Sequence, residues 1–193
     1  MSDFRKHPGF VVPEVYDDGN GPLFEVIEGR RVDRNMWTPM SFATSQIAFE
    51  IMGRRKRESL DGWVVTWPFI ASQSWHPETR RRPPVAYWLN HQFPNGIARE
   101  GDAAVAPALV VEIPTPEEPE AVVRDRVEAY LAAGTAVVWL VDLTARTVRT
   151  EQPDGTAHVY RDGDTLVGGP VLPKFKVEVA KLFPKTASSQ TGV

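Results

Sequence analysis

The stretch that decides the fold runs from residue 108 to residue 142 and reads ALVVEIPTPEEPEAVVRDRVEAYLAAGTAVVWLVD. It opens and closes with short apolar runs, 108–113 and 137–142, of the kind found in strands that are covered on both faces. Between them, residues 117–133 indicate a helix, because Pro116 precedes them, glutamates fill the first turns and Gly134 follows. Strand, helix and strand in succession predict an α/β unit on a mixed sheet.

The flanking sequence adds short strands and one more helix. Residues 23–35 indicate two strands around a turn at Glu28-Gly29. A helix is predicted over residues 41–57, with Ser41 as its N-cap and basic residues at its carboxyl end, where the helix dipole favours cations. Further strands are predicted over 63–70 and 85–89, and a meander over 147–150, 157–160 and 165–167.

These elements predict one α/β domain over residues 23–184, with a mixed central sheet flanked by helices and an added antiparallel meander. An irregular lead-in over 1–22 is expected before the domain, and a flexible tail over 185–193 after it. The length of 193 residues suits one domain with a sizeable core.

Composition excludes several classes of protein. The chain has no cysteine, which excludes a disulfide scaffold, a thiolate metal site and a cysteine nucleophile. No apolar run approaches the roughly 20 residues that a membrane helix needs, and the start has no signal-peptide core. We therefore expect a cytoplasmic location and no membrane partner. A formal net charge of −3 excludes a polybasic protein but not a local basic surface.

The positive charge is concentrated in one part of the chain. From Arg30 to Arg82 there are ten Lys or Arg residues against five Asp or Glu residues. The excess lies in two clusters that could bind phosphates, or could be ordinary solvated surface. Their members are Arg54, Arg55, Lys56 and Arg57 in the first cluster and Arg80, Arg81 and Arg82 in the second.

Two charged residues stand out in the central stretch. Glu112 lies in an apolar run, where it either needs a partner or emerges into solvent as the strand ends. Arg126 shares a helix face with Val122, Val123 and Tyr130, so its guanidinium would need a carboxylate on the sheet. Glu112 would supply that carboxylate. The pair is either a structural ion pair or the mark of a site at the end of the sheet.

The order of these motifs resembles the Uma-two-like family of restriction endonucleases, which belongs to the PD-(D/E)XK nuclease superfamily. The resemblance covers about residues 23–184. It rests on the segments Phe24-Glu25-Val26-Ile27-Glu28-Gly29, Thr38-Pro39, Glu112-Ile113-Pro114-Thr115-Pro116, Arg126 to Tyr130, Gly134, Val138-Trp139-Leu140-Val141-Asp142, Leu172-Pro173-Lys174-Phe175 and Leu182-Phe183.

The resemblance implies a restriction-endonuclease-like fold and Mg²⁺-dependent hydrolysis of DNA, and it allows a homodimer. In such a site a metal ion lowers the pKa of the attacking water, and a lysine orients that water. By the same resemblance, Glu112 and Glu25 are the candidate metal-binding and catalytic carboxylates. Arg126 takes the place of the catalytic lysine, and the two basic clusters are the candidate DNA contacts.

Two positions depart from the family pattern. Pro84 stands where the family has the metal-binding aspartate, and proline offers no side-chain oxygen. Arg126 keeps the positive charge of the lysine but stays protonated, so it cannot serve as a base. We therefore expect an inactive or weak nuclease. The alternatives are an active Mg²⁺-dependent endonuclease that uses Glu112 with a substitute carboxylate such as Glu78, and a non-catalytic protein-interaction domain.

Overall fold

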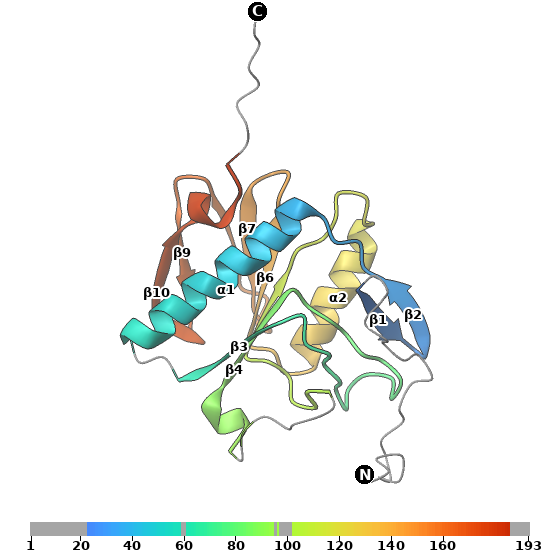
Figure 1. Ribbon diagram of the computed structural model, residues 1–193. Coiled ribbons are helices and arrows are strands. Elements are labelled where there is room, and N and C mark those ends of the chain that lie inside the picture. Colours follow the sequence, from blue (N-terminus) through green and yellow to red (C-terminus); the bar gives the residue numbers. More distant parts are fainter. Residues whose placement is uncertain (1–22, 59–60, 95, 97–101, 186–193) are drawn as a thin grey trace, which may run out of the picture.

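The computed structural model describes residues 23–58, 61–94, 96 and 102–185. The lead-in predicted over 1–22, and all but the first residue of the tail predicted over 185–193, lie outside these residues. The described part has a central sheet between two helices, with a small hairpin at either side (Figure 1).

The central sheet has six strands in the order β3-β4-β5-β6-β7-β8. Strands β5 and β6 are parallel and every other neighbouring pair is antiparallel, so the sheet is mixed, as predicted. The bounds are Gly62–Thr66 for β3, Val85–Leu89 for β4, Leu109–Glu112 for β5, Val137–Asp142 for β6, Thr147–Glu151 for β7 and Ala157–Arg161 for β8. The prediction that β4, β5 and β6 share one sheet is confirmed.

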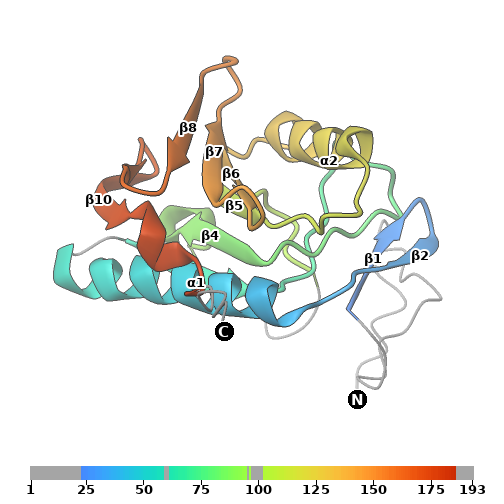
Figure 2. The same ribbon diagram turned by 90° about the horizontal axis from the view of Figure 1, so that it is seen from above.

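Helices α1 (Thr38–Glu58) and α2 (Glu120–Ala132) cover opposite faces of the sheet (Figure 2). On the α1 face, the larger hydrophobic core joins the helix to the sheet and to the carboxyl-terminal hairpin. On the α2 face, Val127 and Tyr130 pack against a smaller apolar cluster that includes Val110 and Val138. Val123 is buried as well, so the predicted packing through Val123, Val127 and Tyr130 is confirmed. Val122 was expected on the same face, but it is exposed.

Two hairpins flank the sheet. In the first, β1 (Phe24–Ile27) and β2 (Arg30–Asp33) are joined at Glu28 and Gly29, both with positive φ, as a tight two-residue turn requires. This hairpin is joined to the rest of the protein by two backbone hydrogen bonds between Val26 and Arg80, of 2.9 and 2.6 Å. The second hairpin pairs β9 (Thr165–Gly168) with β10 (Leu172–Glu178).

The structure corrects the predicted helix starts. Helix α1 begins at Thr38, so Ser41 lies inside the helix and is not its N-cap; Pro39 is tolerated there because it falls in the first turn. Helix α2 begins at Glu120 and not at residue 117. The residue before a proline is disfavoured in the helical conformation, so Pro119 keeps Glu118 out of the helix.

The predicted strands need two corrections. The strand predicted over 63–70 ends at Thr66, because Trp67 adopts a positive φ of 55° and Pro68 follows it. The third member of the predicted meander, β9, does not join β7 and β8. It pairs with β10, which was not predicted, and this pairing buries Leu166 in the core on the α1 face.

Two short 3-10 helices complete the described chain, η2 (Asn90–Gln92) and η3 (Val179–Leu182). Among the described helices, none is long and apolar enough to cross a membrane.

Candidate functional site

Glu112 is the last residue of β5, and its side chain is fully buried. It shares a strand face with Val110, which belongs to the apolar cluster under α2. Of the two alternatives for Glu112, emergence into solvent is therefore wrong, and the carboxylate needs partners inside the protein.

Two hydrogen-bond donors and one further guanidinium surround the Glu112 carboxylate. The Tyr130 hydroxyl donates to Oε1 over 3.0 Å, and Arg34 Nη2 donates to Oε2 over 3.0 Å. Arg126 Nε lies 3.2 Å from the same Oε2, so the expected Glu112–Arg126 ion pair is present. The Arg126 guanidinium is not bidentate on Glu112, because its Nη1 donates to Glu118 over 2.6 Å.

Glu25 lies next to this cluster and is also buried. Its Oε1 accepts a hydrogen bond of 2.8 Å from the backbone N–H of Arg82, and its Oε2 lies 3.6 Å from Arg34 Nη1. Arg34 thus bridges Glu25 and Glu112. The structure brings together the three residues proposed from the sequence as the catalytic centre, Glu25, Glu112 and Arg126.

The cluster, defined as Glu25, Arg34, Glu112, Glu118, Arg126 and Tyr130, is held by three parts of the chain. The first hairpin and the segment after it supply Glu25 and Arg34. Strand β5 supplies Glu112. Helix α2 supplies Arg126 and Tyr130, and the turn before α2 supplies Glu118. The five charged members carry a formal charge of −1, from three carboxylates and two guanidiniums.

Burial and these contacts shift the ionisation of the cluster. Burial and the charge of Glu112 raise the pKa of the Tyr130 hydroxyl well above its ordinary value, so the hydroxyl stays a donor. Burial alone would lower the pKa of Arg34 and of Arg126, but the neighbouring carboxylates outweigh it and raise both. The pKa of Glu118 is lowered, because the hydrogen bond and charge of Arg126 outweigh burial.

Glu118 is the edge of the cluster nearest solvent, with 18% of its side chain exposed. It lines a cavity of about 430 Å³ beside the start of α2, together with Thr115 and Asp142. A solvent-borne ion would therefore meet Glu118 before the buried carboxylates.

The residues of the second basic cluster, Arg80 to Arg82, contact other parts of the fold. Arg80 is buried, pairs with Asp102 and donates to the backbone oxygens of Pro77 and Thr79. These contacts hold the loop beside the first hairpin. Arg80 therefore has a structural role in holding this loop.

Its neighbours are also engaged within the fold. The Arg81 guanidinium lies over the Tyr130 ring at 5.9 Å, and the Arg82 guanidinium lies over the Phe69 ring at 4.5 Å. Arg82 Nε also donates to the backbone oxygen of Trp67 over 2.9 Å. Both guanidiniums therefore have aromatic partners inside the fold.

The first basic cluster lies at the carboxyl end of α1. Its first member, Arg54, has its guanidinium 5.7 Å from the Phe175 ring in β10. This end of α1 is across the molecule from the first hairpin, to which Arg80 is joined (Figure 1). The two basic clusters therefore lie apart and do not flank one cleft around Glu112.

The position predicted to lack the family's aspartate lies beside Glu112. Val85 pairs with Val111, and continuing this antiparallel register by one step sets Pro84 opposite Glu112. The substitute carboxylate considered above, Glu78, lies elsewhere: a Cβ added at Gly29 would meet its Oε2 at 2.5 Å, so Glu78 covers the hairpin turn. Within the described ranges, no group of three or more His, Asp or Glu residues could hold a metal ion.

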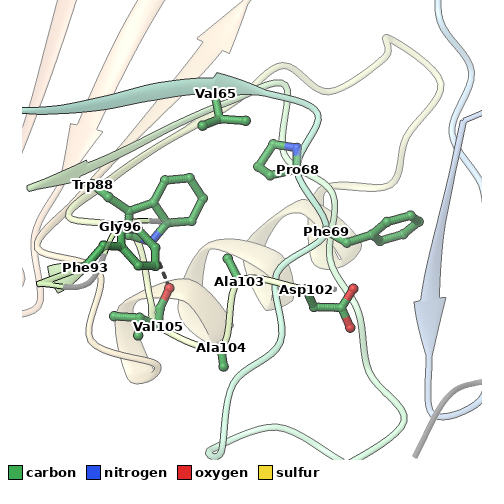
Figure 3. Close-up of a pocket in the computed structure, with 10 residues that line it drawn as sticks. All are labelled: Val65, Pro68, Phe69, Trp88, Phe93, Gly96, Asp102, Ala103, Ala104 and Val105. Carbon is green, nitrogen blue, oxygen red and sulfur yellow. Dashed lines mark hydrogen bonds between the residues drawn. The ribbon is translucent and has the colours of Figure 1, made fainter. Parts of the chain in front are cut away.

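A second cavity, of about 390 Å³, is separate from the cluster and mainly apolar (Figure 3). The Trp88 ring borders it, with its Nε1 hydrogen-bonded to the backbone oxygen of Val105 over 2.8 Å. Among the described residues that line it, Asp102 is the only charged one, and it pairs with Arg80. This cavity therefore offers no chemistry comparable to that of the cluster.

Sequence reasoning missed Arg34, Glu118 and the hydrogen bond of Tyr130. Tyr130 was available as a signal, because it lies four residues after Arg126 on the same helix face. Arg34 follows a strand whose residues are all exposed, so no pattern marked it as buried. Its burial follows from the docking of the hairpin, which is a tertiary effect.

The chain was compared with known proteins. A family model named Uma2, with the description "Putative restriction endonuclease", matches residues 12–180. A solved crystal structure of a "putative nuclease belonging to DUF820" from Anabaena variabilis superposes with a TM-score of 0.69 at 19% identity, over 84% of this chain and 90% of that one. At this identity the likeness concerns the fold. No match was found among curated proteins.

Proposed function

This chain belongs to the Uma2 family of restriction-endonuclease-like proteins, and we propose that it binds DNA with little or no Mg²⁺-dependent cleavage. The observation that carries the proposal is the state of Glu112. Its carboxylate, which the family resemblance assigns to the metal, is neutralised by Arg34 and Arg126 and hydrogen-bonded by Tyr130.

The residues present do not fit a Mg²⁺ ion. Mg²⁺ demands near-ideal octahedral oxygen ligands at about 2.0–2.1 Å and loses its waters reluctantly. Each oxygen of Glu112 already faces a donor, and Glu25 faces the Arg82 N–H on one side and Arg34 on the other. Pro84, opposite Glu112, adds no oxygen ligand from its side chain.

Arg126 is also unsuited to the role of the family's lysine. An arginine does not deprotonate in a protein, and the surrounding carboxylates raise its pKa further. Its guanidinium is divided between Glu112 and Glu118, at 3.2 and 2.6 Å. It therefore stabilises the buried carboxylates and is not available to accept a proton.

DNA binding rests on the family and on the basic end of α1. Helix carboxyl ends favour cations, and a run of four cations can contact phosphates without reading the base sequence. The run is Arg54 to Arg57. The second basic cluster contributes little in this proposal, because its side chains are held by internal partners.

The test combines binding with cleavage on the full chain. We expect binding to duplex DNA whose affinity falls steeply with salt, and no cleavage of supercoiled plasmid in Mg²⁺ or Mn²⁺. Replacing Arg55 and Arg57 with glutamine should weaken binding and flatten the salt slope. A matched control replaces two exposed arginines elsewhere, Arg30 and Arg161, with glutamine. It should change DNA binding less than the double variant at Arg55 and Arg57.

The outcomes separate the alternatives. Mg²⁺-dependent cleavage that is abolished by Glu112→Ala would contradict the proposal and favour an active nuclease. A protein that binds no DNA at low salt would favour a protein-interaction domain instead.

A further inference from the structure

We infer that Arg34 acts as a built-in cation that keeps divalent metal ions from binding between Glu25 and Glu112. The inference rests on the proposed function, because it takes these two glutamates as the carboxylates that would face a metal. It names the residue responsible for the exclusion, which neither the family pattern nor the sequence indicated.

The geometry places one guanidinium between the two carboxylates. Arg34 Nη2 lies 3.0 Å from Glu112 Oε2, and Nη1 lies 3.6 Å from Glu25 Oε2. A metal ion bound to both oxygens would have to lie within about 2.1 Å of each. The guanidinium and such an ion would occupy the same space, so the ion could enter only if Arg34 left.

The backbone holds Arg34 in this position. Its N–H donates to the Leu23 oxygen over 2.6 Å at the end of the first hairpin, and its side chain is only 7% exposed. Helix α1 begins four residues later. The side chain is therefore directed inward by a fixed segment and is not a surface arginine that has folded over the site.

Arg34 has a different role from Arg126. In the described part of the chain, Arg34 makes ion pairs with Glu25 and Glu112, whereas Arg126 pairs with Glu112 and Glu118. Removing Arg126 would leave Arg34 between the two glutamates. Removing Arg34 would leave Glu25 with no ion pair among those contacts and would change the formal charge of the cluster from −1 to −2.

The Arg34 contacts are also incomplete. Arg34 Nη1 is buried without a hydrogen-bond partner, so its contact with Glu25 is ionic only. An uncharged side chain at this position would leave the negative charges of Glu25 and Glu112 without the cation between them. A polyvalent cation is the ligand that this vacated position would attract.

The experiment uses Tb³⁺, whose emission is sensitised by nearby aromatic rings. Tyr130 touches Glu112, and the Trp75 ring lies 5.8 Å from the Tyr130 ring, so a bound ion would be close to both. We expect Arg34→Gln to bind Tb³⁺ at least about tenfold more tightly than the unmodified chain, because a like charge at contact distance is removed. Mn²⁺ should raise the melting temperature of Arg34→Gln and leave that of the unmodified chain unchanged.

Two further variants show where the Tb³⁺ ion binds and keep the test decisive if Arg34→Gln does not fold. Adding Glu112→Gln to Arg34→Gln should abolish the gain in emission. Pro84→Asp alone keeps Arg34 and adds a carboxylate beside Glu112; if Arg34 excludes the ion, this variant should still show no gain. Circular dichroism checks that each variant is folded.

The inference is overturned if folded Arg34→Gln gains no emission, or if Pro84→Asp gains it while Arg34 is intact. The second result decides the matter even when Arg34→Gln does not fold. These failures differ from a failure of the proposed function, which would appear as Glu112-dependent cleavage by the unmodified chain.

Discussion

Replacing Glu112 with glutamine keeps the size of the side chain and removes the charge that two buried guanidiniums share. Arg34 and Arg126 have side chains that are 7% and 3% exposed, so neither can recover its lost partner from water. Removing one member of a buried ion pair costs about 3–5 kcal/mol. Arg34 keeps Glu25 at 3.6 Å and Arg126 keeps Glu118 at 2.6 Å, which places our expectation at the lower end, about 3 kcal/mol.

Urea denaturation at neutral pH, followed by circular dichroism, measures this loss. Tyr130→Phe should cost less, about 1.5–2 kcal/mol, because it removes one hydrogen bond to a charged group. The double variant should lose less than the sum of the two single losses, since Glu112→Gln weakens the same hydrogen bond that Tyr130→Phe removes. Glu117→Gln, at an exposed carboxylate nearby, is the matched control and should stay within about 0.5 kcal/mol.

A loss below about 1 kcal/mol for Glu112→Gln, with an unchanged denaturant slope, would refute this reasoning. It would mean that the two guanidiniums are compensated without Glu112, and that the carboxylate is not the centre of the cluster.

Glu118 should make stability depend on pH. Arg126 outweighs burial and holds the pKa of Glu118 below its ordinary 4.5. The contribution of Glu118 to the free energy of unfolding is therefore complete above that value and is lost as the pH falls toward the folded-state pKa. Below about pH 5, the melting temperature of Glu118→Gln should fall less steeply with pH than that of the unmodified chain. Gly62→Ala would place a Cβ against the Trp88 carbonyl oxygen, closer than two atoms can pack, so urea denaturation should show a loss of about 1–3 kcal/mol. Arg80→Gln should lower stability by at least about 1 kcal/mol in the same assay and leave the DNA affinity of the folded protein unchanged.

Each of these expectations has a contrary result. A Glu118→Gln curve parallel to that of the unmodified chain would show that another carboxylate controls the acid response. A fully stable Gly62→Ala variant would contradict the pairing of β3 with β4. A drop in DNA affinity for folded Arg80→Gln, equal to that of the α1 variants, would return the second basic cluster to the DNA interface.

The central strands were predictable because their signals are local. Strand β6 has the bounds read from its apolar run, and β4 does as well. Element ends were less accurate, because prolines act on their neighbours: Pro119 delays α2, and Pro39 allows α1 to begin early. Strand β10 carries an alternation that the prediction overlooked, Phe175-Lys176-Val177-Glu178, in which the apolar residues are buried. Its pairing with β9 depends on a core formed by distant segments.

The part of the site that carries local sequence signals was predictable, and the part that depends on tertiary packing was not. A carboxylate in an apolar run and an arginine on a buried helix face each signal a missing partner, and Glu112 and Arg126 do meet. Arg34 gave no such signal, since its burial depends on where the hairpin docks. For the second basic cluster, a count of charges in the sequence could not show that Arg80 pairs with Asp102 inside the fold.

The unequal cores on the two faces of the sheet have a consequence for how the protein opens. The face under α1 is backed by an extended apolar core, whereas α2 rests on a small apolar cluster and on buried charges. Apolar burial holds at any ionic strength, but ion pairs at a partly accessible edge weaken with salt. Helix α2 and the first hairpin should therefore separate from the sheet together, as one cooperative unit. In native-state hydrogen exchange, their amides should exchange through an opening of lower free energy than that of β5 and β6, and high salt should widen the difference.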